Sequence, residues 1–315
     1  MNAPAAVRVV VLNYNGRAIL ERCLGSVADA ARRSRRPTRV TVLDNCSRDD
    51  SEAYVRSACP EVHWEPARSN RVFCSYNEYV AKLQEPYVVL LNNDIRVQEG
   101  YSDALVDALE SDDKAWFAAP RVLNDASGEY EGGRAKMEMR YGLPWGTSLF
   151  KGHEGRTLEA GRTMQTGFGA YRRDRFLELG GYDDLFLPGT VEDTDLCFRG
   201  WKKGWGGVYC PDSVVYHMGQ ATFKREFGSA GIRRLNRRNL YLFVWKNVRD
   251  PLLMASHLVW MPVHLVRDLL LGRPEFVAAL SDALGRLPQA LERRRAADRT
   301  DVRSDREVFA LSRSL

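Results

Sequence analysis

The sequence predicts an α/β fold in which helices cover both faces of a mostly parallel, doubly wound sheet. Apolar runs of strand length occur at residues 7–12, 39–43, 87–91 and 115–119, and most contain several β-branched side chains. Segments with apolar residues at helical spacing separate these runs. Strands that alternate with helices form parallel sheets, and such strands are apolar throughout because both faces of the sheet are buried.

The first three of these strands each end in polar residues. The run at 7–12 ends at Asn13-Tyr14-Asn15-Gly16, the run at 39–43 at Asp44-Asn45, and the run at 87–91 at Asn92-Asn93-Asp94. In a parallel α/β sheet, ligands bind beyond the carboxyl ends of the strands. These polar side chains are therefore predicted to converge in one binding site.

The other elements follow from the same periodicities. Helices are expected near residues 19–27, 47–57, 77–83 and 101–110, and short strands at 62–64, 207–210 and 214–216. Pro120 is expected to end the strand at 115–119, because proline cannot donate to a strand ladder. The glycine-containing stretch at 120–165 is expected to form loops over the site together with a few strands.

The composition changes after residue 220, so we expect an α/β domain at 1–220 and a helical region at 221–315. Residues 251–271 are apolar but include charged side chains and Pro262. A spanning helix needs about 20 predominantly apolar residues, so this stretch is interpreted as two interfacial helices that are broken at Pro262. The charged tail after Pro288 is expected to be a loose helix or disordered.

The bulk composition fits a soluble globular protein. The chain has 315 residues, of which 44% are hydrophobic and 28% are charged, enough for one large or two ordinary domains. The six cysteines form no C-x-x-C pair, which indicates reduced thiols of a cytosolic protein rather than a disulfide framework or a zinc site. The residues before Val7 are few and uncharged, unlike a signal peptide.

The net charge of +5 is unevenly distributed. A basic block between Lys224 and Arg249 holds eight cations and a single acid, Glu226. Such a block indicates contact with the phosphates of nucleic acid, lipid headgroups or a phosphorylated substrate; a solvated face is the alternative. Its cations are Lys224, Arg225, Arg233, Arg234, Arg237, Arg238, Lys246 and Arg249.

A carboxylate cluster, Glu192-Asp193-Thr194-Asp195-Leu196, opens an amphipathic segment. Three carboxylates within four residues repel one another unless a helix N-terminus, a cation or a substrate offsets the repulsion. A general base or a metal site is one interpretation, and a solvated helix N-terminus is the other.

Taken in order, these motifs resemble family 2 glycosyltransferases of the GT-A fold, and most of all their bacterial rhamnosyltransferase-like branch. The resemblance covers about residues 7–220, and its specificity lies in the order of the motifs rather than in any one of them. It rests on Val9-Val10-Val11-Leu12-Asn13-Tyr14-Asn15-Gly16, Leu43-Asp44-Asn45-Cys46-Ser47, Leu90-Leu91-Asn92-Asn93-Asp94, the carboxylate cluster and His217.

The resemblance implies a nucleotide-sugar donor, inversion at the anomeric carbon and a divalent ion, Mg²⁺ or Mn²⁺, at the leaving diphosphate. Such hard ions take oxygen ligands and retain waters and phosphate oxygens. Asp94 would bind the ion and His217 would be a further ligand; a core or surface histidine is the alternative. Asp193 would accept the proton of the acceptor hydroxyl, and Glu192 would bind the acceptor or orient Asp193. Asp195 is interpreted as a carboxylate at a helix N-terminus.

The donor site implied by the resemblance is rich in asparagine, and its single acid, Asp44, would accept the N3–H of a pyrimidine base. A role in turn formation is the alternative for Asn13, Asn15 and Asp44. Asn92 stands where an aspartate is frequent, and Val72 and Tyr76 replace small residues near the donor, which indicates a narrowed or altered sugar pocket. The implied donor residues are Asn13, Asn15, Asp44, Asn70, Asn77, Asn92 and Asn93.

The resemblance thus implies transfer of rhamnose from dTDP-rhamnose, or of a hexose from a UDP-hexose, to a glycan or polyprenyl-diphosphate-linked acceptor in bacterial surface polysaccharide synthesis. The basic block and the aromatic residues near it imply a cytoplasmic enzyme held on the anionic inner face of the cell membrane; packing on the core or a homodimer interface is the alternative. A nucleotidyltransferase is disfavoured because its glycine-rich, arginine-containing first loop is absent. Nucleic-acid binding leaves the carboxylate cluster unexplained, and a catalytically silent binding module leaves Asp94, Asp193 and His217 unexplained.

Overall fold

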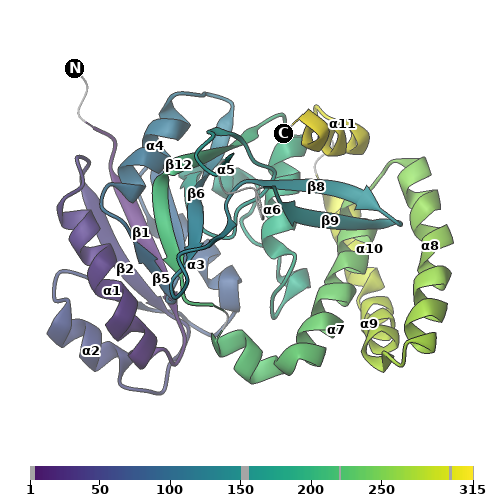
Figure 1. Ribbon diagram of the computed structural model, residues 1–315, viewed down its shortest axis with the longest axis horizontal. Coiled ribbons are helices and arrows are strands. Elements are labelled where there is room, and N and C mark those ends of the chain that lie inside the picture. The colour runs from purple at the N-terminus through teal and green to yellow at the C-terminus, as the bar shows by residue number, and fades with distance from the viewer. Residues whose placement is uncertain (1–3, 150–155, 220, 298–299, 315) are drawn as a thin grey trace.

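The computed structural model describes residues 4–149, 156–219, 221–297 and 300–314, and its largest element is a mixed sheet with the strand order β10-β12-β6-β11-β4-β1-β2-β3 (Figure 1). Strands β3, β2, β1 and β4 run parallel, β11 is antiparallel to β4 and to β6, and β12 runs parallel to β6. The strands of this path are β1 (Val7–Asn13), β2 (Thr38–Asp44), β3 (His63–Pro66), β4 (Tyr87–Asn92), β6 (Ala115–Asn124), β10 (Gly161–Arg162), β11 (Gly169–Arg172) and β12 (Gly206–His217).

Helices cover both faces of this sheet, as predicted. On β1, Val9 and Val11 pack into a core with α1 (Arg17–Arg32), α2 (Ser51–Ala58) and α4 (Tyr101–Glu110). Val10 and Leu12 face the other way, into a core with α3 (Ser75–Lys82), α5 (Arg173–Glu178) and α6 (Glu192–Lys202). Successive side chains of a strand point to opposite faces, so an uninterrupted apolar run serves both cores.

The strand register aligns the polar strand ends. Asn13 lies opposite Asp44 across the β1–β2 pair, and Leu12 lies opposite Asn92 across the β1–β4 pair. The asparagine and aspartate side chains that follow the three strands therefore lie at one edge of the sheet.

The strand predicted to stop at Pro120 instead continues to Asn124. Pro120 lies opposite Cys210, where β12 shifts register between Cys210 and Val214. Proline is tolerated at such an irregularity because no regular ladder bond is required there. The extension of β6 allows β7 (Tyr130–Gly132) to pair with it, while β5 (Ile95–Val97) pairs with β12. The next residues form a hairpin, β8 (Ala135–Arg140) and β9 (Leu143–Ser148).

The C-terminal region is helical and packs on the α/β part through an apolar cluster that joins Phe198 and Trp201 of α6 to Phe243 and Phe309. The predicted boundary at residue 220 coincides with the start of the first helix of this region, and the division into two domains stays a prediction. The helices are α7 (Ala221–Asn247), which is interrupted at Gly228, α8 (Pro251–Leu270), α9 (Pro274–Gly285), α10 (Leu287–Ala296) and α11 (Asp305–Leu311).

The tail after Pro288 is not a loose extension. α10 continues to Ala296, and α11 begins with a capping box in which the Ser304 hydroxyl accepts the backbone N–H of Glu307. The buried Asp305 carboxylate accepts a hydrogen bond of 2.8 Å from Lys202 Nζ of α6. Residues 298 and 299, which belong to the predicted tail, lie outside the described residues.

The predicted break at Pro262 is wrong, because α8 is one helix from Pro251 to Leu270 with Pro262 inside it. A proline inside a helix removes one backbone hydrogen bond and costs about 3 kcal/mol. Two histidines tie α8 to the β8–β9 hairpin on either side of the proline. His257 Nδ1 lies 2.7 Å from Gly142 O, and His264 Nε2 lies 2.8 Å from Tyr141 O. Tertiary contacts therefore hold the helix together across its weak point.

The basic block is not a free cationic surface in the described part of the chain. Arg233 pairs with Glu275, Arg234 with Asp282 and Arg237 with Asp268. The remaining described members are directed inward: Lys246 pairs with Asp183 and Asp195, Arg238 donates to Leu187 O, and Arg249 donates to Arg294 O. The side chains of Lys224 and Arg225 lie outside the described part. The described cations of this block are therefore engaged by acids and carbonyl groups of the chain itself, and the membrane contact of the block stays a prediction.

Candidate active site

A pocket of about 710 Å³ opens beyond the carboxyl ends of β1 and β4, between the sheet, the start of α6 and the start of α7. It brings together the predicted base, the predicted ion ligands and much of the predicted donor site. Those lining residues are Asn13, Asn70, Asn92, Asn93, Asp94, Glu192, Asp193 and His217. Asn15, Asp44 and Asn77 lie outside the lining.

The predicted ion ligands meet in this pocket. Asp94 follows β4, and His217 ends β12, and their side chains approach to 3.4 Å between Oδ2 and Nε2. The other ring nitrogen of His217 lies 2.9 Å from Glu131 Oε2. Asp94 Oδ1 is buried and has no hydrogen-bond partner among the described residues. A buried carboxylate oxygen without a partner is costly, so this atom requires a ligand that the protein itself does not supply.

This arrangement fits a divalent ion shared with a diphosphate. No three His, Cys, Asp or Glu side chains gather to hold an ion within the ranges that the structure describes. Mg²⁺-type sites commonly use one or two carboxylates and complete their shell with water and substrate phosphates. Asp94 and His217 meet that description. Burial lowers the pKa of His217, but the hydrogen bonds and charges of Asp94 and Glu131 outweigh burial and raise it to about 9, so an ion would compete with a proton at this ring.

Glu192 and Asp193 open α6 and line the same pocket. Glu192 Oε2 and Asp193 Oδ1 are buried atoms without a hydrogen-bond partner in the described structure. Burial raises the pKa of both carboxyls, and the nearby Asp193 charge raises that of Glu192 further. A carboxylate whose proton affinity is raised in this way is suited to accept a proton from a hydroxyl near neutral pH.

The loop before α6 is strained. Thr190 and Val191 have φ values of 71° and 70°, in the left-handed region that β-branched residues rarely adopt. The buried Asn239 amide of α7 donates to the carbonyl oxygens of Gly189 and Thr190 at 2.7 and 2.8 Å. Such strain persists only where the surroundings determine the conformation, and it concentrates at functional sites. Asn239 thus helps to place the carboxylates of α6.

Asp195 differs from its two neighbours. Its buried carboxylate accepts hydrogen bonds from Arg199 Nε at 2.9 Å, Lys246 Nζ at 2.7 Å and Asn247 Nδ2 at 2.8 Å. It belongs to the first turn of α6, as expected, but it faces α7 rather than the solvent or the pocket. Its role is to join α6 to the C-terminal region.

The first loop is held by a polar network. Asp44 Oδ1 accepts from Asn13 Nδ2 at 3.0 Å, and Asn13 Oδ1 accepts from Asn93 Nδ2 at 2.9 Å. Asp44 Oδ2 accepts the backbone N–H of Ser47. Asn15 Oδ1 accepts the backbone N–H of Arg48, and its own φ is 45°. These bonds fix the two loops that follow β1 and β2 against each other.

In the segment at residues 70–77, some side chains line the pocket and others pack in the core. Asn70 Oδ1 accepts the backbone N–H of Val72, and both residues line the pocket. Val72 has a φ of 49°, in the left-handed region that favours glycine. Tyr76 is buried in the core, where its hydroxyl donates to Leu91 O, and the Asn77 amide is used on the backbone of Tyr182.

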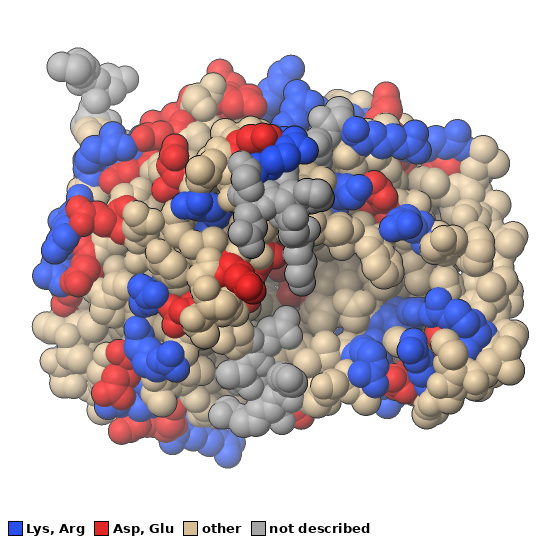
Figure 2. Space-filling model, viewed as in Figure 1, with Lys and Arg blue, Asp and Glu red and all other residues tan. Residues whose placement is uncertain are grey.

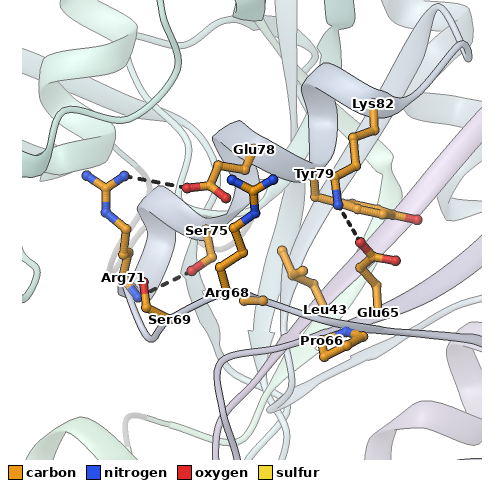
Figure 3. A pocket seen from close by; sticks show the side chains of 11 residues that line it. Leu43, Glu65, Pro66, Arg68, Ser69, Arg71, Ser75, Glu78, Tyr79 and Lys82 are labelled. Atoms are coloured by element: carbon orange, nitrogen blue, oxygen red, sulfur yellow. Dashed lines mark hydrogen bonds and ion pairs between the residues drawn. The ribbon is translucent and has the colours of Figure 1, made fainter.

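A smaller pocket of about 20 Å³ lies between β3 and α3 (Figure 3). Its charged side chains face one another: Lys82 Nζ lies 2.7 Å from Glu65 Oε1, and Arg71 lies 3.8 Å from Glu78. The volume is close to what one water needs, so this pocket is too small for a nucleotide.

Two groups of site residues are absent from the sequence-based predictions. Glu131 and Asn124 approach His217 only because β6 continues past Pro120, and the sequence around them carries no signal beyond its turn residues. The aromatic pair Phe223 and Phe227, whose rings lie 4.7 Å apart, closes the pocket from the first turns of α7. The amphipathic pattern after residue 223 is a usable signal for this pair, although by itself it also fits a membrane surface.

Sequence comparisons identify the family. Residues 8–180 match the family model described as Glycosyl transferase family 2. N-acetylglucosaminyl-diphospho-decaprenol L-rhamnosyltransferase from two strains of Mycobacterium tuberculosis is 26% identical over 290 residues, which cover 80% of this chain and 92% of the relative.

Solved structures agree in fold. GalNAc-T7 with UDP, GalNAc and Mn²⁺ matches with a TM-score of 0.58 and 17% identity over 78% of this chain; the match spans about half of that chain, 48%. Mannosyltransferase PcManGT from Pyrobaculum calidifontis, in complex with GDP-Man and Mn²⁺, matches with a TM-score of 0.53 and 15% identity over 99% of this chain and 85% of that chain. S. aureus TarS matches with a TM-score of 0.54 and 14% identity over 98% and 91%. The chain belongs to glycosyltransferase family 2 and has the GT-A fold.

Proposed function

We propose that this glycosyltransferase moves L-rhamnose from dTDP-rhamnose to an acceptor carried on a polyprenyl diphosphate, with inversion at the anomeric carbon. The observation that carries the proposal is that Asp94, His217 and Asp193 line one pocket. The name of the mycobacterial relative supports the sugar and the acceptor class. A UDP-hexose is the second candidate donor, because the sugar pocket departs from the family pattern at Val72.

The reaction is a single displacement in this proposal. The acceptor hydroxyl oxygen forms a bond to the anomeric carbon while the bond from that carbon to the diphosphate oxygen breaks, and the nucleoside diphosphate leaves with the electron pair. Asp193 Oδ1 takes the proton of the hydroxyl. Attack from the side opposite to the leaving group inverts the configuration, so no enzyme nucleophile is needed. Glu192 lies beside the base and binds or orients the acceptor.

The leaving diphosphate acquires charge on its oxygens, and the site must offset that charge. A bound Mg²⁺ or Mn²⁺ would supply positive charge there. Asp94 Oδ1 and His217 Nε2 are the atoms that would hold the ion. Asn92 and Asn93 bring amide groups to the same end of β4 without further negative charge.

The donor base is assigned to Asp44, at the end of β2. Asp44 Oδ2 accepts a hydrogen bond from Ser47 N–H, and a carboxylate oxygen can accept a second. That lone pair would accept the N3–H of thymine or uracil. Asn13, Asn15 and Asn70 hold the surrounding loops in this proposal. The Asn77 amide, with both ends bonded to the Tyr182 backbone, supports the site indirectly.

The test is a donor panel. Purified enzyme is incubated with dTDP-L-rhamnose and with several UDP-hexoses in the presence of Mg²⁺ or Mn²⁺, and release of the nucleoside diphosphate is measured. We expect dTDP-rhamnose to be hydrolysed fastest, the release to stop with EDTA, and Asp193→Asn to lose turnover while it still binds dTDP. Fastest release from a UDP-hexose would replace the proposed donor, and binding without release from any donor would indicate a silent binding module.

The membrane contact is assigned to α8. Leu252, Val259, Val263, Val266 and Leu270 recur at helical spacing, and each is about half exposed or more, Leu270 most of all at 82%. Figure 2 shows the edge of the molecule formed by α8 as a largely uncharged surface. No helix in the described ranges is long and apolar enough to cross a membrane.

An apolar helix face of this kind suits a helix that lies in the plane of the membrane interface. Tyr141 and Trp260, with ring centroids 4.8 Å apart, stand beside it, and the exposed Arg273 follows the helix. Aromatic and cationic side chains of this kind are frequent at membrane interfaces. The inner face of the cell membrane would place the pocket near a lipid-linked acceptor.

Liposome co-sedimentation with anionic phosphatidylglycerol vesicles tests this assignment. The variant Val259→Glu/Val266→Glu should lose binding, whereas Leu158→Glu, an equally exposed apolar residue far along the chain from α8, should bind as the wild type does. Unchanged sedimentation of the α8 variant would refute the membrane contact. If the wild type binds no vesicles and the α8 variant elutes from size exclusion at a lower apparent mass than the wild type, the same face is assigned to a homodimer instead.

A further inference from the structure

Both ring nitrogens of His217 lie close to a carboxylate. Nδ1 lies 2.9 Å from Glu131 Oε2, while Nε2 faces Asp94 Oδ2 at 3.4 Å. An ionised carboxylate only accepts hydrogen bonds, so Nδ1 must carry a proton. When the ring is neutral, its lone pair is therefore on Nε2 and points into the pocket beside Asp94.

Asn124 determines the direction of this contact. Its Oδ1 accepts the backbone N–H groups of Ala126 at 3.0 Å and Ser127 at 2.9 Å, so the amide cannot turn over without losing both bonds. Its Nδ2 must then face Glu131, and it donates to Oε1 at 2.7 Å. The hydrogen bonds therefore fix which atom donates and which accepts at each contact from the turn at 124–127 to His217.

The backbone around these side chains is fixed by the sheet. His217 lies opposite Asn124 in the β12–β6 pair. The Asp125 N–H donates to His217 O at 3.0 Å, and the Met218 N–H donates to Asp94 O at 3.0 Å. The spacing between the four side chains therefore depends on strand pairing and not on a mobile loop.

We propose that Glu131, oriented by Asn124, is a positioning residue that keeps the Nε2 lone pair of His217 free for the divalent ion. The inference rests on the proposed function in one respect, the presence of an ion at Asp94. Outer partners of a metal-binding histidine fix its tautomer and its ring orientation, and their loss lowers metal affinity by roughly 10–100-fold.

The conservative variant Glu131→Gln is expected to force His217 into the other tautomer. Because Asn124 presents only donors, the glutamine oxygen must face Asn124 and the glutamine NH₂ must face His217. Nδ1 then has to accept, so the ring proton moves to Nε2 and occupies the position of the ion. Glu131→Ala imposes no tautomer, so the alanine variant should bind the ion better than the glutamine variant.

A second-site change should reverse the defect. In Asn124→Asp/Glu131→Gln, one oxygen of the carboxylate introduced at position 124 still accepts from Ala126 and Ser127, and the other accepts the glutamine NH₂. The glutamine oxygen then faces His217 Nδ1–H, and the tautomer of the wild type returns with the same net charge. A residue that merely filled space would not show this reversal.

Mn²⁺ alone is the probe, and its binding is followed by the EPR signal of the free ion. Glu131→Gln should raise the dissociation constant roughly 10–100-fold, Glu131→Ala should raise it less, and the double variant should recover most of the loss. Glu129→Gln, at an exposed glutamate two residues away, serves as the matched control and should bind as the wild type does. Near-UV circular dichroism checks that each variant is folded.

The tautomer is read separately, in histidine-labelled, metal-free enzyme, at a pH at which the nitrogen-15 shifts show a neutral ring. Nitrogen-15 spectra should show Nδ1–H in the wild type and in the double variant, and Nε2–H in Glu131→Gln. The same tautomer in all three, or equal Mn²⁺ affinities of the wild type and Glu131→Gln, would overturn the role of Glu131. If the wild type binds no Mn²⁺ but the tautomers change as expected, the ion of the proposed function fails and the positioning of His217 stands.

Discussion

Two aspartates, two residues apart at the start of α6, are expected to respond to mutation in opposite ways. Asp195 is buried and accepts hydrogen bonds from Arg199, Lys246 and Asn247. Asp193 lines the pocket and has a carboxylate oxygen without a partner among the described residues. Asp195→Asn should therefore unfold more easily, whereas Asp193→Asn should lose transfer and keep its stability.

The loss of stability in Asp195→Asn depends on which other contacts the partners of Asp195 keep. Removal of one partner from a buried ion pair costs about 3–5 kcal/mol. Lys246 keeps Asp183 at 2.7 Å, and Arg199 keeps the carbonyl of Gly181 at 2.6 Å, so the lower limit of about 3 kcal/mol applies. The unfolding entropy of a 315-residue chain is about 0.7 kcal/mol per kelvin, and Tm should fall by about 4–5 °C.

Thermal melts followed by circular dichroism measure this effect, with Asp174→Asn as the control. Asp174 is an exposed acid at the start of α5, and its substitution should change stability by no more than about 0.5 kcal/mol. Nucleotide binding and sugar transfer are measured at a temperature well below every Tm. A wild-type Tm for Asp195→Asn, or an equal loss of stability in Asp193→Asn, would refute the separation of the two roles.

Three further outcomes are expected. Protonated Asp193 cannot accept a proton and its pKa is raised by burial, so the transfer rate should fall as pH is lowered through a midpoint well above the ordinary value of about 3.9; a rate independent of pH between about 5 and 8 would contradict the assignment of the base. Gly200→Ala should destabilise the protein although alanine favours a helix by about 1 kcal/mol, because the new Cβ would lie 2.3 Å from Trp116 Nε1; a raised midpoint of urea unfolding would contradict this packing. Burial lowers the pKa of His257 and His264, so both contribute stability above the unfolded value of about 6.5 that is lost as pH falls below it. His257 contacts Gly142 O through Nδ1 and accepts the indole N–H of Trp245 at Nε2; His257→Gln offers an amide donor and acceptor for these two partners without a titrating ring, and should flatten this part of the stability profile.

The strand ends were predictable from sequence because their signal is local. The side chains of such an apolar run pack into the cores on both faces of the sheet, so the run ends where the sheet ends. The polar residue that follows lies at the edge of the sheet where the site forms. Asn13, Asp44 and Asp94 were placed correctly at this edge on that basis. Parallel pairing of β1 and β2 then brings Asn13 opposite Asp44, which agrees with the expectation that the polar strand ends meet.

The misplaced features share a physical cause, which is that tertiary contacts overrode a local preference. Pro120 and Pro262 were each expected to end an element, and each is tolerated, one at a register shift of β12 and the other between two histidine anchors of α8. The cations after residue 223 were expected to face phosphates, yet Lys246 pairs with Asp183 and Asp195. A charge pattern along one segment does not reveal the acids of distant segments that neutralise it.

The carboxylate cluster shows how such acids can be sorted in a folded chain. Successive residues of a helix differ by about 100°, so Asp193 and Asp195 point to nearly opposite sides of α6. The side that faces α7 provides three donors, and the repulsion expected among three crowded carboxylates is relieved there. Asp193, on the other side, and Glu192, at the very start of the helix, have no cationic partner among the described residues, and both line the pocket. Protein folding rarely retains buried charge without a partner, so this pair of carboxylates, together with Asp94 Oδ1 in the same pocket, marks where substrate and ion must complete the structure.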